Sequence, residues 1–219
     1  MVVVGRILAL IIGYLFGMVL MGYLIGKSKN IDLTKVGSGN VGSTNTMRNL
    51  GVAAGLITLA WDCLKCVVAV FFVWLTFGRF VENVNIYMVY AGLGCVLGHD
   101  FPFYMHFKGG KGVASTLGFI IALFPIGLPV PAGIFIALVA LTRYVSLGSI
   151  IGELSFAIEI VVAAYLGLLS DKYPGGQLKE VVIICCIVSA LSIALHHANI
   201  VRLLKGTENK FSFHPETRA

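Results

Sequence analysis

Charged side chains are scarce in this 219-residue chain. Only 12% of its residues are charged, against about 25% in an ordinary soluble domain, while 58% are hydrophobic and the mean hydropathy is +0.94. Its 16 basic and 10 acidic residues are too few to cover a water-soluble surface. The composition excludes a soluble enzyme, a secreted disulfide scaffold and a disordered chain. It predicts an all-α polytopic integral membrane protein, with residues 1–219 forming a single domain.

Cysteines are also few, and none lies in a polar segment. All five are in apolar stretches, and Cys63 and Cys66 form the one C-x-x-C pair. A structural zinc site needs four ligands, and no second pair follows. We therefore expect no metal site and no cofactor, with the cysteines packing as small hydrophobic residues.

Long apolar runs are abundant, and several approach the ~20 residues that span a bilayer as a helix. Residues 113–142 form a run of thirty that contains Pro125, Pro129 and Pro131. Proline interrupts a helix, and thirty helical residues would extend ~45 Å, so we divide this run into two short spans. Seven transmembrane helices are predicted: 7–26, 52–77, 84–97, the two halves of 113–142 (the fourth and fifth, both short), 146–169 and 180–195.

Basic residues predict how these helices are oriented. With the N-terminus outside and the C-terminus in the cytoplasm, four basic residues face outward, and these are Arg6, Arg79, Lys172 and Lys179. Eleven face inward, namely Lys27, Lys29, Lys35, Arg48, Lys108, Lys111, Arg143, Arg202, Lys205, Lys210 and Arg218. This excess obeys the positive-inside rule.

Two charges interrupt the second span. Asp62 and Lys65 are three residues apart and share one helical face. On insertion scales the two charges raise the free energy of inserting the span into the membrane by ~5–7 kcal/mol. The thirteen Leu, Ile, Val and Phe residues of the span lower it by ~6 kcal/mol. The net free energy of insertion is therefore close to zero unless the two charges pair with other groups. We favour an internal ion pair over a proton or substrate relay, with Glu153 or Glu159 as further possible partners of Lys65.

Three polar segments share the predicted inner face: 37–51 (GSGNVGSTNTMRNLG), 98–115 (GHDFPFYMHFKGGKGVAS) and 196–210 (HHANIVRLLKGTENK). The first spells G-x-G-x-x-G, but the βαβ unit of a dinucleotide site is lacking. Glycine-rich turns instead let backbone N–H groups converge on an anion. Lys108 and Lys111 flank two glycines in the second segment, and this pattern favours an anion cradle over a simple loop.

Helix N-termini strengthen this interpretation. The second, fourth and sixth spans start at the inner face, and Arg48, Lys111 and Arg143 precede or adjoin their first turns. Helix N-termini attract anions, so the three together predict a phosphate site. His196 and Asn199 share one helical face at the end of the last span and could position a hydroxyl group. No histidine is followed by Asp at the fifth position, so the His–Asp pattern of common glycerolipid acyltransferases is lacking.

Taken together, the three segments resemble the three motifs of the bacterial acyl-phosphate-dependent glycerol-3-phosphate acyltransferases (PlsY). Their order and spacing agree, as does the connecting stretch 143–149 (RYVSLGS). The resemblance implies transfer of a fatty acyl group from acyl phosphate to the 1-hydroxyl of glycerol 3-phosphate. The products would be lysophosphatidic acid and phosphate, in the first step of bacterial phospholipid synthesis. Three positions depart from the family pattern: His197, Ala198 and Cys66.

The resemblance also implies which residues act. Catalytic positions fall on Ser38, Arg48, Lys111, Ser149, His196 and Asn199. Phosphate contacts are expected at Arg48, Lys111, Lys108, Gly109, Gly110, Thr44 and Asn45. The partners would be acyl phosphate, glycerol 3-phosphate, membrane lipids and a separate enzyme that forms acyl phosphate, with no nucleic acid. The protein would lie in the bacterial cytoplasmic (inner) membrane, with its active site at the cytoplasmic face.

Two other classes of protein remain as alternatives. A membrane transporter of anions or phosphate esters also directs helix N-termini at its substrate, although here the polar groups gather at one face rather than at the midplane. An intramembrane serine hydrolase would use Ser38 and His196, and a serine-reactive fluorophosphonate probe would then label Ser38.

Overall fold

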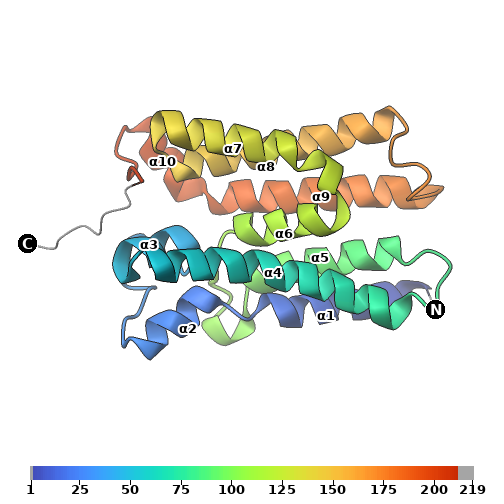
Figure 1. The fold of residues 1–219 in the computed structure, drawn as a ribbon, viewed down its shortest axis with the longest axis horizontal. Coiled ribbons are helices and arrows are strands. Elements are labelled where there is room, and N and C mark those ends of the chain that lie inside the picture. Colours follow the sequence, from blue (N-terminus) through green and yellow to red (C-terminus); the bar gives the residue numbers. More distant parts are fainter. Residues whose placement is uncertain (1, 212–219) are drawn as a thin grey trace, which may run out of the picture.

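The computed structural model describes residues 2–211, and Arg218 of the expected inner-face set lies outside them. All regular secondary structure among the described residues is helical (Figure 1). The α-helices are α1 (Val2–Gly17), α2 (Met21–Ser28), α3 (Ser43–Leu50), α4 (Val52–Phe77), α5 (Asn85–Asp100), α6 (Val113–Leu123), α7 (Pro129–Thr142), α8 (Val145–Tyr165), α9 (Gly176–Leu195) and α10 (His197–Leu204). Two 3₁₀ turns, η1 (Phe103–Met105) and η2 (Pro125–Gly127), complete the set.

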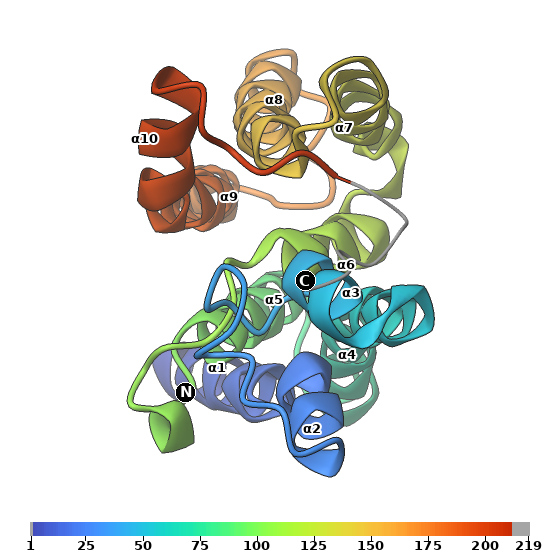
Figure 2. The same ribbon diagram turned by 90° about the vertical axis from the view of Figure 1, so that its left-hand side faces the viewer.

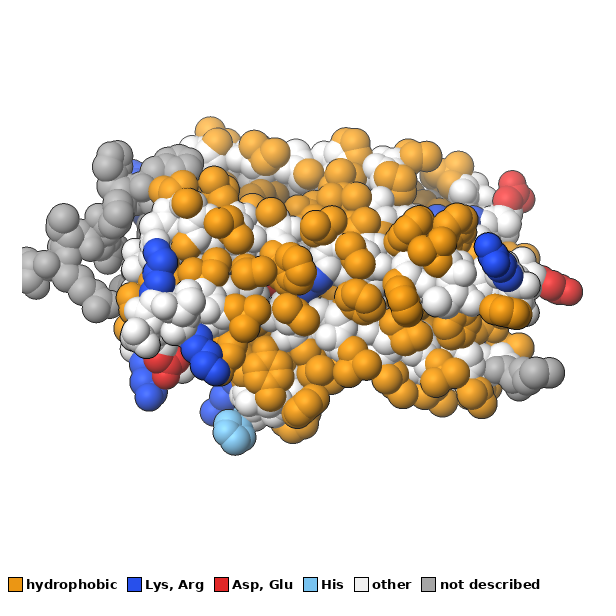
Figure 3. All heavy atoms as spheres, turned by 60° about the horizontal axis from the view of Figure 1, so that its bottom comes forward, with side chains coloured by type: hydrophobic (Ala, Val, Ile, Leu, Met, Phe, Trp, Pro, Cys, Tyr) orange, Lys and Arg blue, Asp and Glu red, His pale blue; other side chains and the backbone are white. Residues whose placement is uncertain are grey.

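Five helical stretches within the described residues are long and apolar enough to cross a membrane: Val2–Ser28, Val52–Phe77, Pro125–Thr142, Val145–Tyr165 and Gly176–Leu195. Helix α6 is a shorter apolar helix. On the face shown in Figure 3, hydrophobic side chains form a broad belt, and most charged groups lie toward its two ends. This distribution is that of an integral membrane protein.

The proline-rich stretch breaks where the sequence predicts. Helix α6 ends at Leu123, the η2 turn starts at Pro125, and α7 begins at Pro129. Proline is tolerated in the first turn of a helix because the missing N–H has no intrahelical acceptor there. The expected division of 113–142 into two short helices is therefore confirmed.

The first span is not one helix, as the sequence analysis had assumed. Helix α1 ends at Gly17 and α2 starts at Met21. The Val19 carbonyl between them accepts hydrogen bonds from Trp61 Nε1 at 3.0 Å and from Lys65 Nζ at 3.2 Å. An unpaired carbonyl inside a bilayer is costly, and these two side chains of α4 satisfy this one. The hydropathy of this stretch does not predict such a break.

The helices form two groups with α6 between them, as the end view in Figure 2 shows. One group holds α1 to α5 and the other holds α7 to α10. Small residues let α1 and α5 approach closely, since a Cβ added at Gly13 would come within 1.9 Å of the Ala91 carbonyl oxygen. The same holds for Gly94, where a Cβ would come within 2.0 Å of the Leu10 carbonyl oxygen. Such small-residue contacts are typical of helix packing in membranes.

The two charges of α4 form an ion pair, as expected. Lys65 Nζ lies 2.8 Å from Asp62 Oδ1, and the two side chains are 1% and 2% exposed. The further partner of Lys65 is His99, whose Nδ1 lies 2.9 Å from the ammonium group. No interaction found among residues 2–211 joins Lys65 to Glu153 or Glu159, the two further possible partners, and His99 of α5 is the third contact instead. We call Asp62, Lys65 and His99 the internal cluster.

Candidate active site

A cavity lies at the end of the molecule that faces the viewer in Figure 2. Its lining comes from both helix groups and from the chain that follows α10. All six side chains predicted to be catalytic line it: Ser38, Arg48, Lys111, Ser149, His196 and Asn199. The structure thus brings together residues that are up to 161 positions apart in the sequence.

Three helix N-termini converge on this cavity, and two of them, those of α6 and α8, are among the three that the sequence predicted. Residues of the first turns of α3, α6 and α8 line it, including Ser43, Val113 and Ser146. Helix α4, the expected second span, begins outside the cavity lining because α3 and Gly51 precede it. First-turn N–H groups have no intrahelical acceptor, so each of the three helices offers donors for an anion.

Asn45 lines the cavity and also holds the local backbone in place. Its Oδ1 accepts from the Ser38 N–H at 2.9 Å, and its Nδ2 donates to the carbonyls of Leu33, Val36 and Asn40. The side chain is 2% exposed. It therefore fixes the turn that carries Ser38, and both Thr44 and Asn45 line the cavity, where their contact with phosphate stays a prediction.

The glycine pair of the second segment also differs from the prediction. The Gly109 and Gly110 N–H groups each donate at 2.9 Å, to the carbonyls of Asp100 and His99, so they are not free for a phosphate. Lys108 is exposed and does not line the cavity. The anion-facing part of this segment therefore starts at Lys111 and continues into α6, where Val113 and Ala114 line the cavity.

Three cationic side chains line the cavity, Arg48, Lys111 and Arg202, and Arg202 is paired with Glu208. None of the ion pairs found among residues 2–211 includes Arg48. Lys111 Nζ donates to Asn199 Oδ1. Burial, followed by the neighbouring charge of Arg202, lowers the pKa of Lys111 to about 8, although Glu208 acts in the opposite direction. At neutral pH Lys111 is still charged, so the cavity carries excess positive charge.

His196 stands at the junction of α9 and α10. Its Nδ1 donates to the Ser192 carbonyl at 2.8 Å, because a carbonyl can only accept, and Nε2 therefore keeps a lone pair. Burial, and then the charge of Lys111, lowers the pKa of His196 to about 4. The ring is neutral at pH 7 and can accept a hydrogen bond from a hydroxyl group.

Sequence reasoning missed the carboxylate of this site. Glu208 accepts from Ser146 Oγ at 2.8 Å, from Asn199 Nδ2 at 2.7 Å and from Arg202 Nε at 2.6 Å. Burial alone would raise the pKa of Glu208, but these hydrogen bonds outweigh it and lower the pKa. No local sequence pattern predicts the contact of Glu208 with Ser146 of α8, since the turn after α10 brings the two together. Arg143, expected beside the phosphate, instead donates to the Phe211 carbonyl at 2.9 Å and lies outside the cavity lining.

Comparison with known proteins agrees with this geometry. Residues 7–206 match the family model described as glycerol-3-phosphate acyltransferase. The chain is 45% identical over 202 residues to glycerol-3-phosphate acyltransferase 2 of Thermotoga maritima, covering 91% of this chain and 93% of that one. It is 38% identical over 210 residues to the glycerol-3-phosphate acyltransferase of Halalkalibacterium halodurans, covering 95% and 97%.

Solved structures are similar as well. The glycerol 3-phosphate form of PlsY, an integral membrane glycerol 3-phosphate acyltransferase, has a TM-score of 0.80 at 34% identity over 94% of this chain and 96% of that chain. Its lysophosphatidic acid form has a TM-score of 0.77 at 33% identity, covering 95% and 96%.

Proposed function

This chain belongs to the PlsY-type glycerol-3-phosphate acyltransferase family, whose product is lysophosphatidic acid, and we propose acyl phosphate as its acyl donor. The 1-hydroxyl oxygen of glycerol 3-phosphate forms a bond to the acyl carbonyl carbon. The bond from that carbon to the phosphate oxygen breaks, and inorganic phosphate leaves. The observation that carries this proposal is the convergence of three helix N-termini with Arg48 and Lys111 on one cavity.

Both substrates carry phosphate, which suits a site built from cations and amides. Arg48 and Lys111 hold the phosphate groups and neutralise the charge that develops on the leaving one. Free N–H groups in the first turns of α3 and α6 add donors whose positions are fixed before reaction. Since acyl phosphate is already activated, the protein needs to supply no nucleophile.

The attacking hydroxyl is positioned by the second half of the site. His196 Nε2 accepts its hydrogen bond, while Asn199 and Ser149 complete the polar surface around it. With its pKa near 4, His196 is a weak base, so a phosphate oxygen is the better final acceptor of the proton. Holding the two substrates in register supplies much of the rate.

An apolar flank provides for the acyl chain. Leu59 of α4 and Phe135 of α7 line the same cavity as the polar groups, and α4 and α7 are candidate membrane-spanning helices. A fatty acyl chain that extends between these helices stays within the bilayer while its carbonyl group reaches Lys111.

The finer topology follows from the charge distribution. We assign seven membrane crossings, with the N-terminus outside and the active site and C-terminus at the cytoplasmic face of the bacterial inner membrane. The α1 end and the α10 end lie at opposite ends of the molecule (Figure 1), as an odd number of crossings requires. A separate enzyme must supply the acyl phosphate.

The test uses purified protein in nanodiscs with glycerol 3-phosphate and palmitoyl phosphate. Phosphate release and lysophosphatidate formation should proceed together at a 1:1 ratio. Activity with palmitoyl-CoA in place of palmitoyl phosphate would overturn the donor but keep the reaction. No turnover with either donor, in protein shown to be folded, would overturn the proposal and favour an anion transporter.

A further inference from the structure

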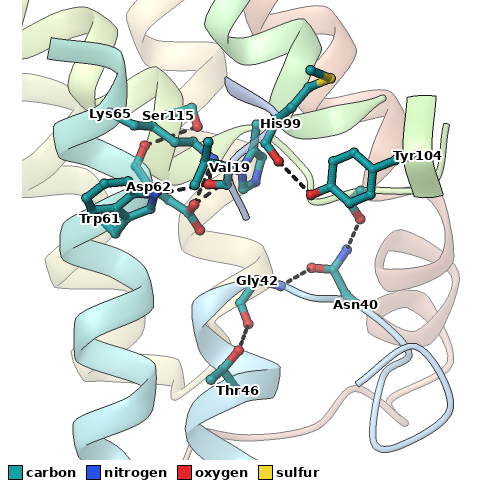
Figure 4. A network of polar contacts seen from close by, with 12 residues as sticks. Val19, Asn40, Gly42, Thr46, Trp61, Asp62, Lys65, His99, Tyr104 and Ser115 are labelled. Atoms are coloured by element: carbon teal, nitrogen blue, oxygen red, sulfur yellow. Dashed lines mark hydrogen bonds and ion pairs between the residues drawn. The ribbon is translucent and has the colours of Figure 1, made fainter. Parts of the chain in front are cut away.

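The internal cluster, drawn in Figure 4, is almost entirely buried, and two of its members, Asp62 and His99, also line the active-site cavity. Lys65 Nζ donates to Asp62 Oδ1 at 2.8 Å and to the Val19 carbonyl at 3.2 Å, and it lies 2.9 Å from His99 Nδ1. The three side chains of the cluster are between 1% and 4% exposed. It therefore joins α4, α5 and the break between α1 and α2.

The contacts of the Lys65 ammonium group indicate which nitrogen of His99 carries the proton, since Nδ1 is 2.9 Å from Lys65 Nζ but 3.6 Å from Asp62 Oδ1, beyond hydrogen-bond distance. An ammonium group has three hydrogens and no lone pair, and all three hydrogens of Lys65 are used in these contacts. His99 Nδ1 must then accept, so the proton of the neutral ring is on Nε2. No hydrogen bond found among the described residues engages that Nε2.

The histidine supports the turn that carries Lys111. The Gly110 N–H donates to the His99 carbonyl at 2.9 Å. A Cβ added at Gly110 would lie 1.9 Å from His99 Nε2, so the turn rests directly on the ring. On the other side of Lys111, Ser115 Oγ in the first turn of α6 donates to the Asp62 carbonyl at 3.2 Å. The internal cluster thus holds the chain on both sides of Lys111.

A plain stabilising ion pair does not account for this arrangement. Lys65 and Asp62 could neutralise each other without a histidine, as Arg6 and Glu180 do at 2.9 Å at the opposite end of the molecule. Here the pair also determines which nitrogen of His99 carries the proton and how its ring is turned. Asp62 and His99, moreover, line the cavity that holds Arg48 and Lys111.

We propose that Asp62, Lys65 and His99 are positioning residues for the phosphate site: the ion pair orients the His99 ring, and the ring supports the turn that places Lys111 and the N-terminus of α6. They act through Gly110 and Ser115 and transfer no group themselves. This inference rests on the proposed function, since it assumes that Lys111 holds a phosphate group of a substrate.

Lys65→Met is the first test, with apparent KM values for glycerol 3-phosphate and palmitoyl phosphate measured separately in nanodiscs. We expect at least one KM to rise roughly tenfold while kcat changes less than about threefold, because small displacements of a binding group weaken ligand positioning. The thermal midpoint should also fall, since Asp62 is left buried and unpaired.

The double variant Asp62→Asn/Lys65→Met separates positioning from stability. It leaves no unpaired charge, so the thermal midpoint should return toward that of the wild type, whereas the raised KM should persist because nothing orients His99. Recovery of KM together with the midpoint would overturn the inference.

His99→Asn provides a second variant in case Lys65→Met does not fold. Asparagine keeps an acceptor near the place of Nδ1 and removes the part of the ring beneath Gly110, so the protein should fold and show the raised KM. Wild-type KM values in this variant would overturn the inference.

Glu180→Gln is the matched control, because it breaks an ion pair at the far end and should lower the midpoint with both KM values unchanged. Wild-type protein without turnover would defeat the proposed function itself, whereas active wild type with unaltered variants would defeat this inference alone.

Discussion

The internal cluster and the cavity contain the same kinds of side chains, yet they use their charges in opposite ways. In the internal cluster the Lys65 ammonium group makes three contacts, with Asp62, His99 and a backbone carbonyl. In the cavity Arg48 takes part in none of the ion pairs found among residues 2–211, and Lys111 donates to a neutral amide. A charge with internal partners organises the protein, and a charge without them is available to a substrate.

Removal of the cavity cations should break this comparison most strongly. Arg48→Ala and Lys111→Ala should each lower kcat/KM by roughly 100-fold to 1,000-fold, the range for loss of one donor that stabilises developing charge. Lysophosphatidate formation by purified protein is the readout. Arg79→Ala is the matched control, since that guanidinium is exposed and lies outside the cavity lining, and it should stay near wild-type activity. Comparable losses in all three variants would point to a general field effect instead of a binding site.

The pH profile should show which charge matters. A lysine with a lowered pKa is charged below that pKa and neutral above it, so kcat/KM should fall about tenfold per pH unit above about 8. In Lys111→Arg the guanidinium stays charged, and the alkaline decline should disappear even if the activity is lower overall. An identical decline in this variant would assign the titration to another group.

Much of the helix pattern could be predicted from the sequence, because apolar length and proline position act locally. The bounds of α4 and the division at Pro125 depend on nothing else. The break at Val19 could not be predicted, since the donors that satisfy its carbonyl, Trp61 and Lys65, lie on a helix more than 40 residues away. A hydropathy profile is a local average along the sequence and does not report contacts between distant helices.

The composition of the site was predictable and its hydrogen bonding was not. Residue types and motif order identify the six side chains that line the cavity. Whether the Gly110 N–H faces a ligand or a carbonyl depends on how α5 ends, and the sequence does not encode this locally. The hydrogen bonds of Glu208 could not be predicted for the same reason, because its partners come from α8 and α10.

Loss of the Glu208 charge should have an intermediate effect. Glu208→Gln keeps the shape but removes the ionic acceptor of Arg202, so Asn199 is held less firmly and kcat should fall roughly tenfold, as expected for a charge-assisted hydrogen bond. Glu82→Gln, an exposed carboxylate remote from the cavity lining, is the control and should leave kcat unchanged. A wild-type kcat in Glu208→Gln would show that Asn199 does not depend on this contact.

Replacement of Lys108 should have the smallest effect. It tests the comparison with a cation that lies outside the cavity lining. Lys108 is exposed and outside the cavity lining, so Lys108→Ala should change kcat/KM by less than about twofold, as is usual for surface substitutions. A loss above tenfold would restore Lys108 as a phosphate ligand and would require the turn to rearrange on binding.

The break between α1 and α2 has a consequence for the assembly of the protein in the membrane. Helix α4 must enter the bilayer with two charges, and an ammonium group at mid-depth opposes insertion by ~2.5–3.5 kcal/mol. The Val19 carbonyl precedes α4 in the chain and is therefore synthesised before Lys65. His99 follows only later, on α5. The irregular joint thus offers the charge of α4 an acceptor from an earlier part of the chain, in addition to Asp62 on α4 itself, so we expect insertion of α4 to depend on the break between α1 and α2.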